Sequence, residues 1–266
     1  MKMDRTKLLE ALTAAAQRDS RIVGLLLTGS LGAGGGDVWS DVDTVLVTTP
    51  ETHAEVVASA REWVAAISPP VLWRQLYPPH PLFHAVLPGW LRLDTTITVP
   101  GRIPTVRSAS IPLYDPSGLH PRLPEQLPLR QPDPAKIAGI VEEFLRIMGL
   151  APVAFGRGDL LGASRGWELL RGLLLDLLVE AQAPPLPAGA LATTRLLSPA
   201  DLDLITRLPV PHLNREAILA AQVALAETFL RRARGLAEAH GARWPEALER
   251  EMRDHLQREL GLRLEG

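Results

Sequence analysis

The sequence predicts an α+β fold, in which a part that mixes strands and helices is followed by an all-α helical bundle. Strand-like runs rich in β-branched residues all fall before residue 116. After residue 134, apolar residues recur at helical spacing instead. Between the two parts, regular structure is excluded by Pro116, Pro121, Pro124, Pro128, Pro132 and Pro134. We therefore expect domains at 1–115 and 135–266, joined by a proline-rich linker at 116–134.

The same patterns predict the individual elements. In the first part we expect helices over 4–18 and 51–66, and strands over 22–28, 42–48, 71–77, 82–87, 90–99 and 108–114. In the second part, periodic apolar runs predict helices through Ile137 to Met148 and through Trp167 to Leu178. Asn214 suits the start of a long helix, and Pro245 suits the first turn of a last one.

One motif combines a turn with two acids. Gly29-Ser30 ends the first expected strand, and ten residues later Asp41 and Asp43 flank the start of the next. Two carboxylates two residues apart in a strand point to the same face. Such a pair at the end of a buried strand is unfavourable unless a cation lies between its members. The turn itself offers backbone N–H groups and a hydroxyl to phosphate oxygens.

A third acid, Asp94, lies in the strand expected over 90–99. It is the only Asp or Glu between Glu62 and Asp115. An isolated acid among apolar strand residues needs a partner, which is either a cation shared with other acids or an arginine such as Arg92. We favour the shared cation.

The spacing of the Gly-Ser turn and the two acids resembles the signature of the DNA polymerase β-like nucleotidyltransferases, and in particular their small antibiotic-modifying members. The resemblance covers the first part of the chain by motif and the second by general helical character. It implies a nucleotidyltransferase catalytic domain with a mixed sheet at 1–115 and a helical acceptor-binding domain at 135–266. An acceptor hydroxyl would attack the α-phosphate of a nucleoside triphosphate.

The resemblance also implies roles for single residues. Asp41, Asp43 and Asp94 would be catalytic and would hold two Mg²⁺ ions, which prefer carboxylate oxygens. Asp94 would take the acceptor proton, while Gly29 and Ser30 would bind the phosphates of the nucleotide. The implied reaction transfers a nucleoside monophosphate, AMP from ATP, to a hydroxyl of a small molecule such as an aminoglycoside or lincosamide antibiotic.

The segment after the turn departs from the family pattern. Small-molecule members often carry basic residues there, but residues 31–37 have no positive charge and four glycines. Glycines allow the backbone to approach a ligand closely. Either an arginine from elsewhere meets the phosphate charge, or triphosphate binding is weak.

Composition excludes several classes of function. With 28 basic and 30 acidic residues, the net charge is −2, which argues against long nucleic acids as partners. The absence of cysteine excludes disulfides, thiolate nucleophiles and cysteine-ligated zinc. No signal peptide or membrane-spanning run is recognisable, so we expect a cytoplasmic protein without a membrane partner. A homodimer is left open.

Two other functions are compatible with these residues. The transferase could act on a protein or an RNA end, as toxin–antitoxin nucleotidyltransferases do. Alternatively, the chain could be a non-catalytic, vestigial nucleotide-binding protein, although three retained acids argue against this.

Further residues have a functional and a structural interpretation. Glu142 and Glu143 are either general-base candidates or solvent-facing helix residues, and we favour the second. Asp159 is expected to be a helix N-cap. The arginines at 231, 232 and 234 are expected on a solvated face. Among the histidines, His84 is the one to check, because its strand is expected beside that of Asp94.

Overall fold

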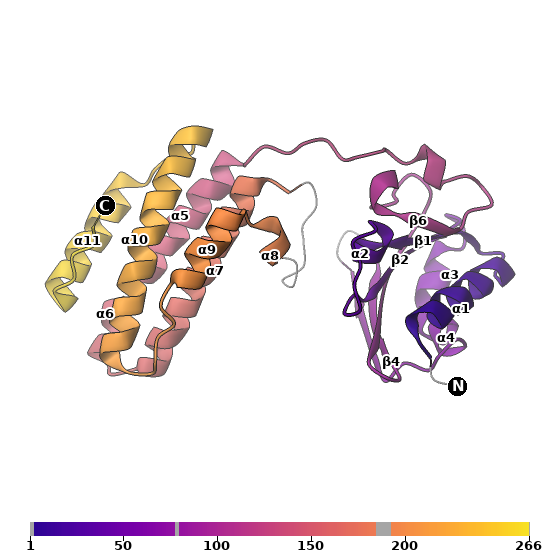
Figure 1. Cartoon of the computed structure of the whole chain (residues 1–266), viewed down its shortest axis with the longest axis horizontal. Helices are drawn as coiled ribbons and strands as arrows, with labels where there is room; N and C mark the ends of the chain where they lie inside the picture. Colours follow the sequence, from indigo (N-terminus) through magenta and orange to yellow (C-terminus); the bar gives the residue numbers. More distant parts are fainter. Residues whose placement is uncertain (1–2, 78–79, 185–192, 266) are drawn as a thin grey trace. The chain divides into compact units, whose positions relative to one another are not determined.

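The computed structural model describes residues 3–77, 80–184 and 193–265 (Figure 1). The chain divides into two compact units, Met1–Leu127 and Pro128–Gly266. The division falls inside the proline-rich stretch. The α+β prediction is confirmed, because the first unit contains a mixed sheet with helices and the second consists of helices.

The first unit is built on a six-stranded sheet in the order β3-β4-β5-β2-β1-β6. Its strands are β1 (Ile22–Thr28), β2 (Val42–Thr48), β3 (Leu72–Leu76), β4 (Leu82–Leu87), β5 (Leu91–Thr98) and β6 (Ile111–Tyr114). Only the β2–β5 pair is parallel among these strands, and the other neighbours are antiparallel. Strand β6 begins three residues later than expected, because a 3₁₀ turn precedes it.

Helices cover one face of this sheet (Figure 1). They are α1 (Arg5–Arg18), α3 (His53–Ala58) and α4 (Ala60–Ala65). The short α2 (Gly29–Gly32) follows β1, and the 3₁₀ turns η1 (Arg107–Ala109) and η2 (His120–Arg122) lie elsewhere in the unit. Apolar residues of α1, α3 and α4 pack with every second residue of the strands in one buried core. The helix expected over 51–66 is divided at Ser59, whose hydroxyl donates to the Glu55 carbonyl at 3.0 Å and whose backbone is not helical.

The opposite face of the sheet is covered differently. There Val45 and Val47 of β2 pack with Leu119, which follows the last strand. The Asp115 carboxylate accepts the backbone N–H groups of Leu119 and His120, at 2.7 and 2.9 Å, and so shapes this turn. The chain beyond residue 115 therefore still contributes to the core of the first unit.

The second unit is all α. Its helices are α5 (Pro134–Met148), α6 (Ala151–Gly156), α7 (Leu160–Gln182), α8 (Thr193–Leu196), α9 (Pro199–Arg207), α10 (Arg215–His240) and α11 (Glu246–Leu260). The Phe144 and Phe229 rings stack where α5 meets α10, with their ring centres 3.6 Å apart. The expected N-cap Asp159 accepts the Gly162 N–H at 2.8 Å, and Asn214 caps α10 in the same way. Across the described residues, no helix has both the length and the apolar character needed to cross a membrane.

A buried carboxylate ties the start of this unit to α7. The Glu180 side chain is fully buried and accepts hydrogen bonds from Arg130 at 2.6 Å, Lys136 at 2.7 Å and the Asp133 N–H at 2.8 Å. Burial raises the pKa of Glu180, but these donors outweigh it and lower the pKa to about 2. The segment before α5 is therefore held by charge-assisted hydrogen bonds.

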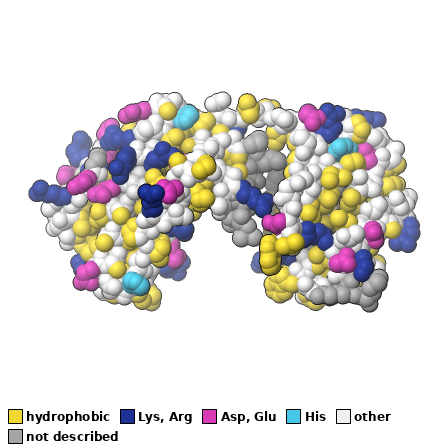
Figure 2. All heavy atoms as spheres, viewed as in Figure 1, with side chains coloured by type: hydrophobic (Ala, Val, Ile, Leu, Met, Phe, Trp, Pro, Cys, Tyr) yellow, Lys and Arg dark blue, Asp and Glu magenta, His cyan; other side chains and the backbone are white. Residues whose placement is uncertain are grey.

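The basic run at 231–234 is not simply a solvated face. Arg232 pairs with the buried Asp201 of α9, and Arg234 pairs with the buried Glu249 and lies 4.4 Å from the centre of the Trp244 ring. The two arginine side chains remain 42% and 40% exposed, so the face is partly solvated as expected, but their carboxylate partners lie on other helices. Figure 2 shows acidic and basic side chains interspersed on the visible face of this unit.

Candidate active site

The structure brings the three predicted acids together. Asp43 of β2 and Asp94 of β5 are direct neighbours in the parallel register, and Asp41 lies just before β2. One carboxylate oxygen from each of the three lies within 4.8 Å of the others. All three residues are partly buried. They form one acidic cluster, which consists of Asp41, Asp43 and Asp94.

A hydrogen bond on the other face of the sheet stabilises the register of β2 and β5. Thr44 follows Asp43, Thr95 follows Asp94, and the Oγ1 atoms of the two threonines are 2.9 Å apart in a buried hydrogen bond. Because successive side chains alternate between faces, this bond lies on the helix-covered side, while the acids point to the other side. The threonine pair stabilises the alignment that sets the two acids next to each other.

The acids influence one another electrostatically. Burial, followed by the negative charges of Asp41 and Asp94, raises the pKa of Asp43 to about 6, with Arg92 and His84 acting in the opposite direction. Carboxylates held this close favour a bound cation or a proton. Oxygen ligands in such a set match the preference of Mg²⁺, so the residues fit this ion.

Arg92 lies beside the cluster but not where the sequence alternative put it. Its Nη1 is 3.5 Å from Asp41 Oδ2, and its Nη2 donates to the Trp39 carbonyl at 2.9 Å. Leu93 pairs with Val42 in the register, so the preceding residues of the two strands also lie side by side. The alternative pairing of Asp94 with Arg92 is therefore wrong.

The partner of Asp94 is a histidine. His84 Nδ1 lies 2.8 Å from Asp94 Oδ2, and the two residues are opposite each other in the antiparallel β4–β5 pair. The sequence indicated His84 as worth checking because of its expected strand. The register that decides the contact could not be read from the sequence.

The predicted Gly-Ser turn forms the start of α2 and lies directly against Asp43. Gly29 has φ +61°, and a Cβ atom there would be 2.0 Å from Asp43 Oδ2. Only a residue without a side chain can approach the carboxylate this closely in this conformation. The Ser30 hydroxyl donates to Ser40 Oγ at 2.9 Å, which links the two ends of the ten-residue connection.

Two distant arginines hold the loop over 33–39, which has no basic residue of its own. Arg5 of α1 donates to the carbonyls of Asp37 at 2.7 Å and Val38 at 2.9 Å. Arg92 holds the next carbonyl, that of Trp39, whose side chain is 82% exposed. Sequence reasoning missed both contacts, because they join residues more than 30 positions apart.

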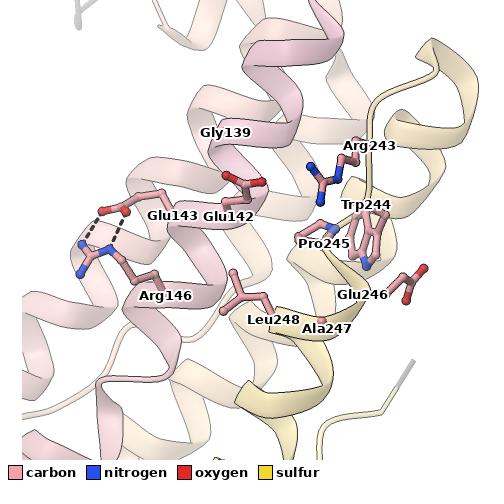
Figure 3. A pocket seen from close by; sticks show the side chains of 10 residues that line it. All are labelled: Gly139, Glu142, Glu143, Arg146, Arg243, Trp244, Pro245, Glu246, Ala247 and Leu248. Atoms are coloured by element: carbon pink, nitrogen blue, oxygen red, sulfur yellow. Dashed lines mark hydrogen bonds and ion pairs between the residues drawn. The ribbon is translucent and has the colours of Figure 1, made fainter.

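A separate cavity of about 750 Å³ lies in the second unit, between α5 and the start of α11 (Figure 3). Glu142, Glu143 and Trp244 are among its lining residues. Both oxygens of Glu143 accept from Arg146, at 2.6 and 2.7 Å, and Glu142 is exposed. Trp244 donates to Glu249 at 2.7 Å. These contacts favour the structural interpretation of the two glutamates.

Comparison with known proteins adds a likeness in fold. No protein-family model and no curated protein matches the chain. Among solved structures, it is similar to an aminoglycoside 6-adenyltransferase from Bacillus subtilis and a nucleotidyltransferase-like protein from Exiguobacterium sibiricum. The first match has 12% identity and a TM-score of 0.43, and covers 95% of this chain and 98% of that one. The second has 14% identity and a TM-score of 0.38, and covers 96% and 88%.

Proposed function

We propose that the protein is a Mg²⁺-dependent nucleotidyltransferase that transfers AMP from ATP to a hydroxyl group of a small molecule. The observation that carries the proposal is the acidic cluster, in which oxygens of Asp41, Asp43 and Asp94 lie within 4.8 Å of one another. The Gly29-Ser30 turn lies beside it, in contact with Asp43.

The acidic cluster would hold two Mg²⁺ ions. When bound, such ions stabilise the negative charge that develops on the attacking and leaving oxygens of a phosphoryl displacement. Asp41 lies just before β2, Asp43 lies on β2, and Asp94 lies on the parallel neighbour β5. Burial and the neighbouring charges of Asp41 and Asp94 raise the pKa of Asp43, and bound cations would relieve the repulsion among the three carboxylates.

The residues of the chain would then act on the substrates. The acceptor oxygen forms a bond to the α-phosphorus, and the bond from that phosphorus to pyrophosphate breaks. Asp94 takes the proton that the acceptor hydroxyl loses. Ser30 and the backbone at Gly29 bind the remaining phosphates, and Arg92 supplies positive charge beside the cluster.

A small acceptor agrees with the charge of the chain. The net charge is −2, and both signs are interspersed on the surface in view in Figure 2. Enzymes that track long nucleic acids rely on a basic surface to bind phosphates. We therefore assign the acceptor to the small hydroxylated molecules and name aminoglycoside and lincosamide antibiotics as the first class to test.

The test combines the purified protein with Mg²⁺, the four ribonucleoside triphosphates and a pool of hydroxylated antibiotics, followed by mass spectrometry, and parallel reactions replace the antibiotics with an RNA or a protein. The expected product is an acceptor heavier by one AMP group, together with pyrophosphate. Asp43→Asn should form none. Asp4→Asn is the matched control, since Asp4 caps α1 in the same unit and asparagine caps a helix equally well.

Each outcome has a defined meaning. Product from the wild type and from Asp4→Asn, but not from Asp43→Asn, supports the proposal and identifies the nucleotide and the acceptor. Product only on an RNA end or a protein would keep the chemistry and overturn the small-molecule acceptor. No nucleotide transfer and no pyrophosphate release with any of these acceptors would refute the transferase.

A further inference from the structure

We propose that His84 is a positioning residue, which fixes the Asp94 carboxylate in the orientation needed to bind a metal ion. The inference rests on the proposed function, because it deepens the role of the same site. Its basis is the contact between His84 Nδ1 and Asp94 Oδ2, at 2.8 Å, within hydrogen-bond distance.

The backbone places His84 on the far side of Asp94 from the other acids. In the sheet order, β5 lies between β4 and β2, so Asp94 has His84 as its neighbour on one side and Asp43 on the other. Directly opposed residues on neighbouring strands project from the same face and interact. The three side chains therefore form a row across three strands.

This row restricts what the Asp94 carboxylate can do. A carboxylate rotates broadly about its last side-chain torsion, because that torsion has no sharp staggered minima. The hydrogen bond from His84 engages Oδ2 and removes this freedom, which leaves the other oxygen to serve the acidic cluster. Mg²⁺ demands close to ideal octahedral ligand geometry, so a fixed carboxylate binds it better than a rotating one.

The magnitude of the effect follows from other metal sites. Loss of a hydrogen bond to a metal ligand typically weakens metal affinity or activity by about 10- to 100-fold. The same hydrogen bond matters little for folding, since the side chains of His84 and Asp94 are 36% and 26% exposed. Metal affinity and stability should therefore respond differently when His84 is replaced.

Two substitutions distinguish which ring nitrogen of His84 carries the effect. His84→Asn keeps a donor near the position of Nδ1, whereas His84→Gln places its donor near the position of Nε2. His53→Gln is the matched control, because His53 Nδ1 also contacts a side chain of the first unit, Thr48 Oγ1, at 3.1 Å. Mn²⁺ is the probe, and its binding to each protein is measured by electron paramagnetic resonance without nucleotide.

We expect His84→Gln to bind Mn²⁺ about 10- to 100-fold more weakly than the wild type. His84→Asn and His53→Gln should bind it like the wild type, and all four proteins should unfold at similar temperatures. In the transfer assay, excess Mg²⁺ should restore much of the activity of His84→Gln.

Three results would overturn the inference: unchanged Mn²⁺ binding in His84→Gln, an equal loss in His84→Asn, or no Mn²⁺ binding by the wild type. Failure of the transferase is a separate result. A protein that shows the expected Mn²⁺ pattern but transfers no nucleotide would support the role of His84 and refute the proposed reaction.

Discussion

Asp43 Oδ2 occupies the space in which a side chain on Gly29 would begin, 2.0 Å from the Cβ position. The turn that follows β1 and the acid at the start of β2 are thus in direct contact. Thr28, the last residue of β1, is also paired with Asp43 in the antiparallel register. The position of the turn and the position of the acid depend on each other.

Gly29→Ala should displace Asp43 and weaken both Mn²⁺ binding and nucleotide transfer. The new methyl group cannot fit beside the carboxylate, and alanine adds about 1–2 kcal/mol of left-handed backbone strain. Gly34→Ala carries the same strain, at φ +74°, but has no atom within 4 Å of its Cβ position. Metal titrations of the two variants separate contact from strain. Equal losses in both would show that the contact with Asp43 does not matter.

Asp43→Asn should stabilise the metal-free first unit at pH 8. The folded-state pKa of Asp43 is raised to about 6, above the ordinary 3.8, so the folded state loses stability as the pH rises between these values. A shift of this size corresponds to about 2–3 kcal/mol. Urea unfolding in EDTA should show the gain at pH 8 and little difference below pH 4. A variant no more stable than the wild type at pH 8 would contradict the raised pKa.

Glu180→Gln should destabilise the second unit by about 3 kcal/mol, because it breaks a buried charge cluster and leaves its cations without their partner. The exposed pair of Glu143 and Arg146 provides the control, since Glu143→Gln should cost below about 1 kcal/mol. Urea unfolding at pH 7 measures both. The two variants should not lose similar amounts.

The lowered pKa of Glu180 also predicts that acid destabilises the second unit. The folded-state pKa of Glu180 is lowered to about 2 from 4.5. Its contribution is therefore fully present above pH 4.5 and is lost as the pH falls toward 2. The pH dependence of unfolding should be weaker over this range in Glu180→Gln than in the wild type.

Thr44→Val should cost about 1–3 kcal/mol, because it leaves the buried Thr95 hydroxyl without its partner. Replacing both threonines with valine removes the unpaired group, so the double variant should be more stable than the sum of the single effects predicts. A double-mutant cycle in urea measures the difference. Additive losses would mean that the hydrogen bond does not couple the two strands.

The sequence predicted the strands around the site well because their signals are local. Strands β1, β2 and β4 have the expected bounds, since short apolar or alternating runs end there at glycine, threonine or proline. The acids were recognisable because Asp41 and Asp43 are two residues apart after the Gly-Ser motif, and Asp94 is the only acid in its region of the chain.

The remaining features depend on register and on distant contacts. Arg92 contacts Asp41 rather than Asp94 because of the parallel register of β2 and β5, which no local pattern reveals. Arg5 reaches the carbonyl of Asp37 across the fold, and Glu180 collects donors from about 50 positions earlier. Side-chain type alone does not select such partners.

The parallel pairing of β2 with β5 also affects how the protein folds. Parallel neighbours cannot be joined by a tight hairpin, and here α3, α4, β3 and β4 lie between them in the chain. Contacts between segments so far apart form slowly, because a long loop must first close. A nascent chain that has not yet emerged past β5 lacks Asp94 and with it the complete ion site. The site is therefore complete only once β5 has paired with β2.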